Sequence, residues 1–244
     1  MPRFHAPPGD WVSDGVALRS EEARHALRVL RLRAGDACEV FDGAGRCVTG
    51  RVGRAEGTCL RVDFDGPVRV EESPVRELVL VSAVAKGRTM DWILEKATEL
   101  SVSRIVAVVT DRTVVRLDAG GCAEKETRWR RDLIEACKQC GRNRLPDLRV
   151  VRGIGEALRI TADCGLRVFG ALDDRSRRIR DVVEQGVLGH GAVAVFIGPE
   201  GDFTAEEASD LRCAGVQPVG FGPLVLRMET AVVYAVSVLR EMCL

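Results

Sequence analysis

The sequence predicts an α/β protein in which a small β-barrel or meander precedes a domain built on a parallel sheet. Residues 36–70 contain short strand-like stretches separated by turns such as Asp42-Gly43-Ala44-Gly45 and Glu56-Gly57. After Glu71-Glu72-Ser73-Pro74, apolar segments alternate with helical ones. Such alternation is typical of a parallel sheet covered by helices.

The first predicted domain, residues 1–72, holds a helix followed by three strands. The helix begins near Ser20 and carries Arg24, Arg28 and Arg31 as a stripe along one side. Such a stripe suits phosphate oxygens, although a charged helix face is more often simply solvated. The strands are expected at 38–41, 47–52 and 59–64.

The second predicted domain, residues 73–244, alternates strands and helices. We expect strands at 78–84, 105–109, 166–172, 192–197 and 216–219. Helices are expected at 91–100, 124–140, 179–184, from residue 204, and at 229–242. The start at Thr204 is the best defined, because Thr204 and Glu207 have the spacing of a capping box.

Composition indicates a globular protein. The chain is 46% hydrophobic, contains no run of about eighteen apolar residues and begins without the apolar stretch of a secretion signal, so we expect it in the cytoplasm. The net charge is zero, yet residues 86–152 hold fifteen basic and ten acidic side chains. Positive charge is therefore concentrated in the middle of the chain.

The nine cysteines form no disulfide framework and are expected to be reduced. Cys137 and Cys140 have the spacing of a redox or zinc pair, but no second pair exists, and His5, His25 and His190 form no cluster. We prefer a structural role, since Cys137 and Cys140 continue an apolar helical stripe with Trp129 and Leu133. No metal site is expected.

Two turns at strand ends are the strongest candidates for a ligand site. Gly198-Pro199-Glu200-Gly201 and Phe221-Gly222-Pro223 each follow a predicted strand, and ligands bind at the carboxyl ends of parallel strands. Each alone is more often an ordinary turn. Dinucleotide-binding and P-loop signatures are missing from the sequence, which disfavours a dehydrogenase or a P-loop NTPase.

From end to end the chain resembles the RsmE family, the 16S ribosomal RNA uracil-N3 methyltransferases of the SPOUT class. The likeness rests on the order and spacing of short motifs, at 3–4, 25–31, 90–100, 135–142, 198–201 and 225–231. It implies a PUA-like β-barrel followed by a SPOUT α/β domain with a deep trefoil knot, a rare exception to the rule against knots. It also implies a homodimer that uses S-adenosylmethionine to methylate N3 of a uridine in the small (30S) subunit. Alternatives are a knotted ribose 2′-O methyltransferase and an inactive RNA-binding or ribosome-assembly protein.

The resemblance also implies site residues. The cofactor would contact Leu172, Ile197, Gly198, Pro199, Glu200, Gly201, Phe221, Gly222, Leu224, Val225, Leu226 and Arg227. RNA would contact Arg3, Arg24, His25, Arg28, Arg31, Lys86, Arg88, Lys96, Arg112, Lys138, Gln139 and Arg142. Arg227 and Glu229 are the catalytic candidates: Arg227 either stabilises charge on the uracil oxygens or pairs with Glu229, and no general base is assigned.

Four positions depart from the family pattern. Asp202 and Ser101 stand where glycine is usual, and Leu224 and Thr89 where a basic residue is common. If position 202 needs a positive φ, aspartate can adopt it at a modest cost. We therefore expect the turn to survive.

Overall fold

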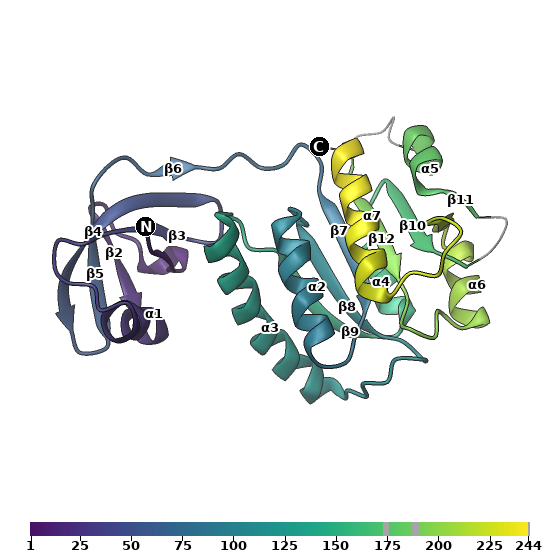
Figure 1. Cartoon of the computed structure of the whole chain (residues 1–244), viewed down its shortest axis with the longest axis horizontal. Coiled ribbons are helices and arrows are strands. Elements are labelled where there is room, and N and C mark those ends of the chain that lie inside the picture. The colour runs from purple at the N-terminus through teal and green to yellow at the C-terminus, as the bar shows by residue number, and fades with distance from the viewer. Residues whose placement is uncertain (173–175, 187–190, 244) are drawn as a thin grey trace. The chain divides into compact units, whose positions relative to one another are not determined.

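The computed structural model describes residues 1–172, 176–186 and 191–243, and His190 lies outside these ranges. The chain forms two compact units (Figure 1). Unit 1 is Met1–Ser73 with Ile134–Leu145, and unit 2 is Pro74–Leu133 with Pro146–Leu244. The division predicted from the sequence, after residue 72, did not assign Ile134–Leu145 to the first domain. That residues 1–72 and 73–244 are separate functional domains stays a prediction.

Unit 1 is built on a six-stranded sheet with the order β1-β3-β4-β5-β2 and β6 paired to β4. The strands are β1 (Arg3–His5), β2 (Gly15–Arg19), β3 (Ala37–Phe41), β4 (Arg46–Glu56), β5 (Cys59–Phe64) and β6 (Arg69–Val70), with a short turn of helix, η1 (Pro8–Asp10), between β1 and β2. The three predicted strands are confirmed as β3, β4 and β5. Strands β1, β2 and β6 were not predicted, and of these β1 and β6 are only three and two residues long, too short to show a period.

The predicted helix of unit 1 is confirmed from Ser20, but it is short. It comprises α1 (Ser20–Arg24) and a π-helical turn, η2 (His25–Val29). Arg31 then has a left-handed φ of 55°. The helix packs Ala23 and Ala26 into the sheet core, so its arginines lie on the outer side.

The segment 134–145 is hydrogen-bonded into unit 1 through main chain and side chains. Leu145 N donates to Gly43 O at 2.9 Å, and Gly45 N donates to Asn143 O at 3.1 Å. Cys137 is buried against Phe41 and Cys47. The prediction that Cys137 and Cys140 both belong to a buried apolar stripe is confirmed for Cys137 and wrong for Cys140, which is exposed.

Unit 2 is built on a seven-stranded parallel sheet, as predicted, with the order β11-β13-β10-β12-β7-β8-β9. The strands are β7 (Leu78–Ala83), β8 (Arg104–Val109), β9 (Asp147–Arg152), β10 (Leu166–Gly170), β11 (Arg177–Arg178), β12 (Val193–Ile197) and β13 (Gln217–Gly220). The helices are α2 (Arg88–Glu99), α3 (Ala119–Cys140), α4 (Ile154–Ile160), α5 (Ile179–Gly186), α6 (Ala205–Cys213) and α7 (Met228–Cys243). Of these, β9, α4 and β11 were not predicted.

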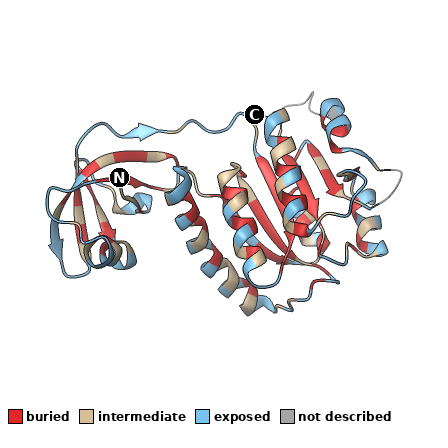
Figure 2. Cartoon of the chain, in the orientation of Figure 1, coloured by how far each residue is buried: buried red, intermediate tan, exposed pale blue. Residues whose placement is uncertain are grey.

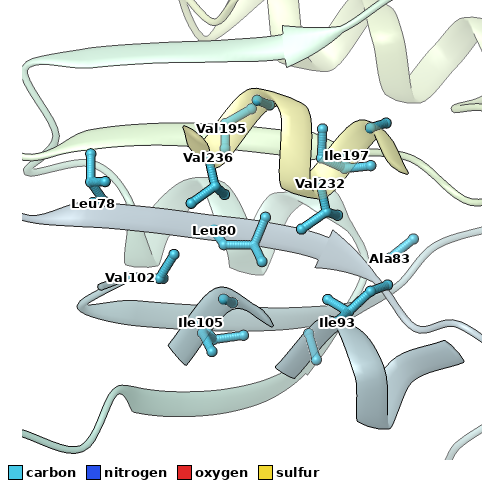
Figure 3. Packing of buried hydrophobic residues seen from close by; sticks show 14 of the residues in the cluster. Leu78, Leu80, Ala83, Ile93, Val102, Ile105, Val195, Ile197, Val232 and Val236 are labelled. Atoms are coloured by element: carbon cyan, nitrogen blue, oxygen red, sulfur yellow. The ribbon is translucent and has the colours of Figure 1, made fainter. Parts of the chain in front are cut away.

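Helices cover both faces of this sheet. On one face, β7 contributes Leu78 and Leu80 to a core with α2, α5, α7 and the unit 2 part of α3, and Figure 3 shows Val232 and Val236 of α7 over Leu80. On the other face, Val79 and Val81 pack with α4 and α6. The central strands are therefore buried throughout, as Figure 2 shows for β7 and β12.

Candidate functional site

The turn after β12 is a tight loop that a left-handed residue closes. Asp202 has a φ of 62°, and its N–H donates to Pro199 O at 2.8 Å. Its carboxylate Oδ1 accepts a hydrogen bond from Phe203 N at 2.7 Å. This local bond favours the left-handed conformation that aspartate tolerates better than most residues. The expectation that the turn survives with aspartate is met.

The turn runs directly into a capped helix. Thr204 Oγ1 accepts from Glu207 N at 3.1 Å, and Glu207 Oε2 accepts from Thr204 N at 2.9 Å, so the predicted capping box is confirmed. The other carboxylate oxygen of Glu207 accepts from Asp111 N at 3.0 Å. One buried carboxylate therefore ties the start of α6 to the loop that follows β8.

The same loop holds the turn through Arg112. Its Nη1 donates to Gly201 O at 2.7 Å and lies 3.4 Å from Phe203 O. The RNA contact expected of Arg112 stays a prediction, and the structure shows that its guanidinium is bonded to the backbone of the turn. No local sequence signal indicates this role, because the partners are 89 positions apart.

The turn after β13 lies beside the end of β10. Ala171 N donates to Val219 O at 3.0 Å, and a side chain at Gly170 would come within 2.7 Å of the Phe221 ring. That ring also packs against Tyr234 of α7, with the ring centroids 5.7 Å apart. Gly170 is therefore needed for Phe221 to lie where it does.

Three strand ends are thus brought to one edge of the sheet. Strand β10 pairs with both β12 and β13, all parallel, so Leu172, Gly198 and Phe221 follow adjacent strands in the same direction. Around them Leu172, Leu224 and Val225 expose 69%, 74% and 78% of their surface, whereas Ile197 and Pro199 are buried. The predicted cofactor residues share one edge that offers backbone groups and uncovered apolar side chains.

Arg227 and Glu229 lie at the start of α7. Arg227 is exposed, and its carbonyl accepts from Ala231 N at 2.8 Å in the first turn of the helix. Within the described residues no ion pair joins Arg227 to Glu229. Of the two roles considered for Arg227, pairing with Glu229 is not realised, and its guanidinium is available to a ligand.

The residues expected to contact RNA fall into two groups. Five are exposed and have no hydrogen-bond or ion-pair partner within the described part of the chain, namely Arg24, Arg28, Arg31, Lys86 and Arg88. Gln139 is also exposed, and His25 packs edge-on to Phe4 with ring centroids 6.1 Å apart. The others, Arg3, Lys96, Arg112, Lys138 and Arg142, are engaged within the protein or buried.

Arg3 is enclosed in unit 1. It forms an ion pair with Glu39 at 2.7 Å, donates to Cys137 O at 2.9 Å and stacks over Phe41 with 4.9 Å between guanidinium and ring centre. Its interactions are those of a structural side chain. Lys96 is bonded to two glutamates of its own helix, at 2.7 Å and 2.8 Å.

Lys138 lies in a buried charge cluster. It pairs with Glu22 and, at 2.7 Å, with Glu135, and only 8% of its side chain is exposed. Burial raises the pKa of Glu22 although Lys138 opposes the shift, and its Oε2 is buried without a hydrogen-bond partner. Burial likewise lowers the pKa of Arg142. Both cations are enclosed within unit 1, where removing one member of a buried charge pair leaves the other uncompensated.

Metal-ligand clusters and membrane-spanning helices are both absent from the described residues. No group of three or more His, Cys, Asp or Glu side chains is arranged to hold a metal ion. No helix among them is long and apolar enough to cross a membrane.

Comparisons with known proteins agree with this architecture. The model of the RNA methyltransferase domain matches residues 71–240, and that of the RNA methyltransferase PUA domain matches residues 18–57. The ribosomal RNA small subunit methyltransferase E of Bacillus subtilis is 30% identical over 229 residues, covering 91% of this chain and 88% of the relative.

Two solved structures resemble the whole chain. One is the ribosomal RNA small subunit methyltransferase E of Neisseria gonorrhoeae bound to S-adenosyl methionine, with a TM-score of 0.84 and 30% identity over 99% of this chain and 98% of that one. The other is a putative methyltransferase of Legionella pneumophila with bound SAM, with a TM-score of 0.87 and 30% identity over 99% and 97%. The α/β fold with an RNA methyltransferase PUA domain is thus confirmed, and the chain belongs to the ribosomal RNA small subunit methyltransferase E family.

Proposed function

We propose that this protein transfers a methyl group from S-adenosylmethionine to N3 of a uridine in the 16S ribosomal RNA of the small subunit. The observation that carries the proposal is the sheet edge at which the turns after β10, β12 and β13 meet, in a chain that resembles SAM-bound relatives along almost its full length. The uridine atom comes from the family resemblance alone. A deep trefoil knot and a homodimer are further parts of the proposal that rest on that resemblance.

The residues at this edge fit such a cofactor. The carbonyls and N–H groups of the turns beginning at Gly198 and Phe221 suit the polar atoms of the ligand, and the uncovered Leu172, Leu224 and Val225 suit its adenine and ribose faces. Gly222 has a φ of 116°, which a side chain would strain. Bound there, S-adenosylmethionine supplies an electrophilic methyl group on its sulfonium.

The chain's own contribution is to present the uracil. Its N3 normally pairs with another base, so the nucleotide must be unpaired and N3 deprotonated. The free guanidinium of Arg227 is suited to stabilise the negative charge that then spreads onto the carbonyl oxygens. The stripe at Arg24, Arg28 and Arg31 and the pair Lys86 and Arg88 are the free cations we assign to the RNA backbone.

The test is to incubate the protein with radiolabelled S-adenosylmethionine and unmodified small ribosomal subunits, and to map the labelled nucleotide by mass spectrometry. Label on uracil N3 supports the proposal. Label on a ribose 2′-oxygen would instead identify a ribose methyltransferase. Neither label nor cofactor binding by calorimetry would identify an RNA-binding or assembly protein.

Replacing Arg227 tests the catalytic assignment. We expect Arg227→Ala to lower methyl transfer by about 100-fold or more while RNA binding and cofactor binding stay within about threefold, because the charge arises only in the transition state. Arg240→Ala, an exposed arginine farther along α7, is the matched control. Unchanged turnover in Arg227→Ala would remove this residue from the mechanism.

A further inference from the structure

A cavity opens at the carboxyl ends of two strands that carry none of the turns assigned to the cofactor. It lies where β8 and β9 end, has a volume of about 940 Å³, and is walled on the third side by the loop leading into α3. That volume is within the range of pockets that hold small organic ligands. Its polar lining residues are Thr110, Asp111, Arg116, Asp118 and Arg152.

The charges of the lining suit a nucleotide. Arg116 and Arg152 are exposed and have no acidic partner among the described residues, so both guanidiniums are available to an anion. Asp118 is already engaged, since its Oδ1 accepts from Gly121 N at 2.8 Å at the start of α3. The carboxylate of Asp111 has no such partner in the described part of the chain, so it can accept from a ribose hydroxyl or a base amino group.

The cavity shares a wall with the loop that holds the candidate cofactor turn. Asp111 lines the cavity and its N–H donates to Glu207, and the adjacent Arg112 donates to Gly201 O. Thr110 and Thr113 close this loop into a buried turn, with 2.8 Å between their hydroxyl oxygens. The cavity therefore adjoins the sheet edge where the turns after β10, β12 and β13 meet, but it is separate from that edge.

We infer that this cavity binds a nucleotide of the RNA substrate other than the one that is methylated, with its phosphate between Arg116 and Arg152. The inference rests on the proposed function, because an RNA strand lying across this edge would extend from the cofactor turns past the loop. Single-stranded RNA is commonly recognised by nucleotides splayed into separate pockets. The cavity is such a pocket at the β8–β9 end.

The experiment compares two variants of the full-length protein. Arg116→Gln combined with Arg152→Gln removes both charges, and Arg149→Gln, an exposed arginine of β9 outside the cavity, is the matched control. Equilibrium binding of unmodified small-subunit ribosomal RNA is measured over a series of KCl concentrations. For the double variant we expect binding to weaken about tenfold and the salt slope to fall by about 0.7, the value for one single-stranded phosphate.

The controls keep the outcome interpretable. The control variant should bind RNA like the wild type, and S-adenosylmethionine affinity and the thermal midpoint should be unchanged in both variants. Should the double variant be unstable, Arg116→Lys with Arg152→Lys keeps the charges and is expected to retain the slope. An unchanged affinity and slope in a folded double variant would overturn the inference.

Two further results separate this inference from the proposed function. If the wild type transfers no methyl group but the double variant alone loses RNA affinity, the proposed function fails and the cavity remains an RNA site. If free uridine monophosphate fills the cavity while RNA binding does not depend on Arg116 or Arg152, the site belongs to a mononucleotide and the inference is overturned.

Discussion

Two groups of basic residues in unit 1 belong to similar family motifs, but one group is exposed and the other is enclosed by the protein. Arg24 and Arg28 lie on a short helix and Arg31 lies just past its end, all three exposed and without a partner among the described residues, whereas Arg3 and Lys138 are enclosed by acidic and carbonyl partners. Arg24 and Arg28 are four residues apart on consecutive helical turns, so their common side follows from local geometry, whereas the position of Arg31 does not. The second group is buried by contacts over more than a hundred positions, which no local pattern reports. Membership of a family motif alone therefore does not distinguish an exposed, unpaired cation from an enclosed one.

The largest expected effect comes from Lys138. Changing Lys138→Met leaves the mostly buried carboxylate of Glu22 without its cation, and we expect the free energy of unfolding to fall by about 3 kcal/mol. Urea denaturation measures it. Lys86→Met, an exposed lysine without a partner in the described residues, should change the value by less than about 0.5 kcal/mol. Equal effects of both substitutions would erase the distinction between the two groups.

The opposite behaviour is expected of the stripe. Changing Arg24, Arg28 and Arg31 to Gln together should weaken binding of small-subunit ribosomal RNA about thirtyfold and lower the salt slope by about 2, with little loss of stability. Filter binding over a KCl series and a thermal melt measure the two quantities. If the salt dependence of RNA binding by the triple variant equalled that of the wild type, the three arginines would form only a solvated surface.

A smaller effect is expected in how the destabilisation caused by Lys138→Met varies with pH. Burial raises the pKa of Glu22 above its unfolded value, so protonation favours the fold and this contribution is lost as pH rises through the folded-state pKa. In Lys138→Met the pKa rises further. We therefore expect the destabilisation to be about 1 kcal/mol smaller at about pH 5 than at about pH 8. A difference that does not vary with pH would show that Glu22 is not the group left unpaired.

The fold was predictable where burial is continuous and the signal is local. Strands β7 and β12 are buried on both faces and read as apolar runs, and the cap at Thr204 lies within four residues. Strand β9 was missed because half of its residues are charged, so it lacks the continuous apolar run of β7 and β12, and its alternation of charged and apolar residues covers only Asp147 to Val150. Strand β1 was too short to show a period.

The candidate site was predictable to the same extent. The glycine turns follow from residue type and position. A positive φ at Asp202 was expected only on the condition that the family's usual glycine marks one, and the structure has 62° there and 66° at Ser101. The role of Arg112 depends on a partner far along the chain, and the cavity near Arg116 is formed by residues of two strand ends and of the loop before α3 that lie apart in the sequence. Neither the bond of Arg112 to the turn nor the cavity can be predicted from the local sequence.

The return of residues 134–145 to unit 1 bears on biosynthesis. Arg3 needs the carbonyl of Cys137, and Arg144 bonds to the carbonyls of Ala44 and Glu71 at 2.8 Å and 2.7 Å. Unit 1 therefore cannot be completed when only residues 1–73 have left the ribosome. It must wait for residues 134–145, which are translated after the first segment of unit 2. An N-terminal domain usually folds first during synthesis, but in this chain unit 1 cannot finish folding before the first segment of unit 2 has been made.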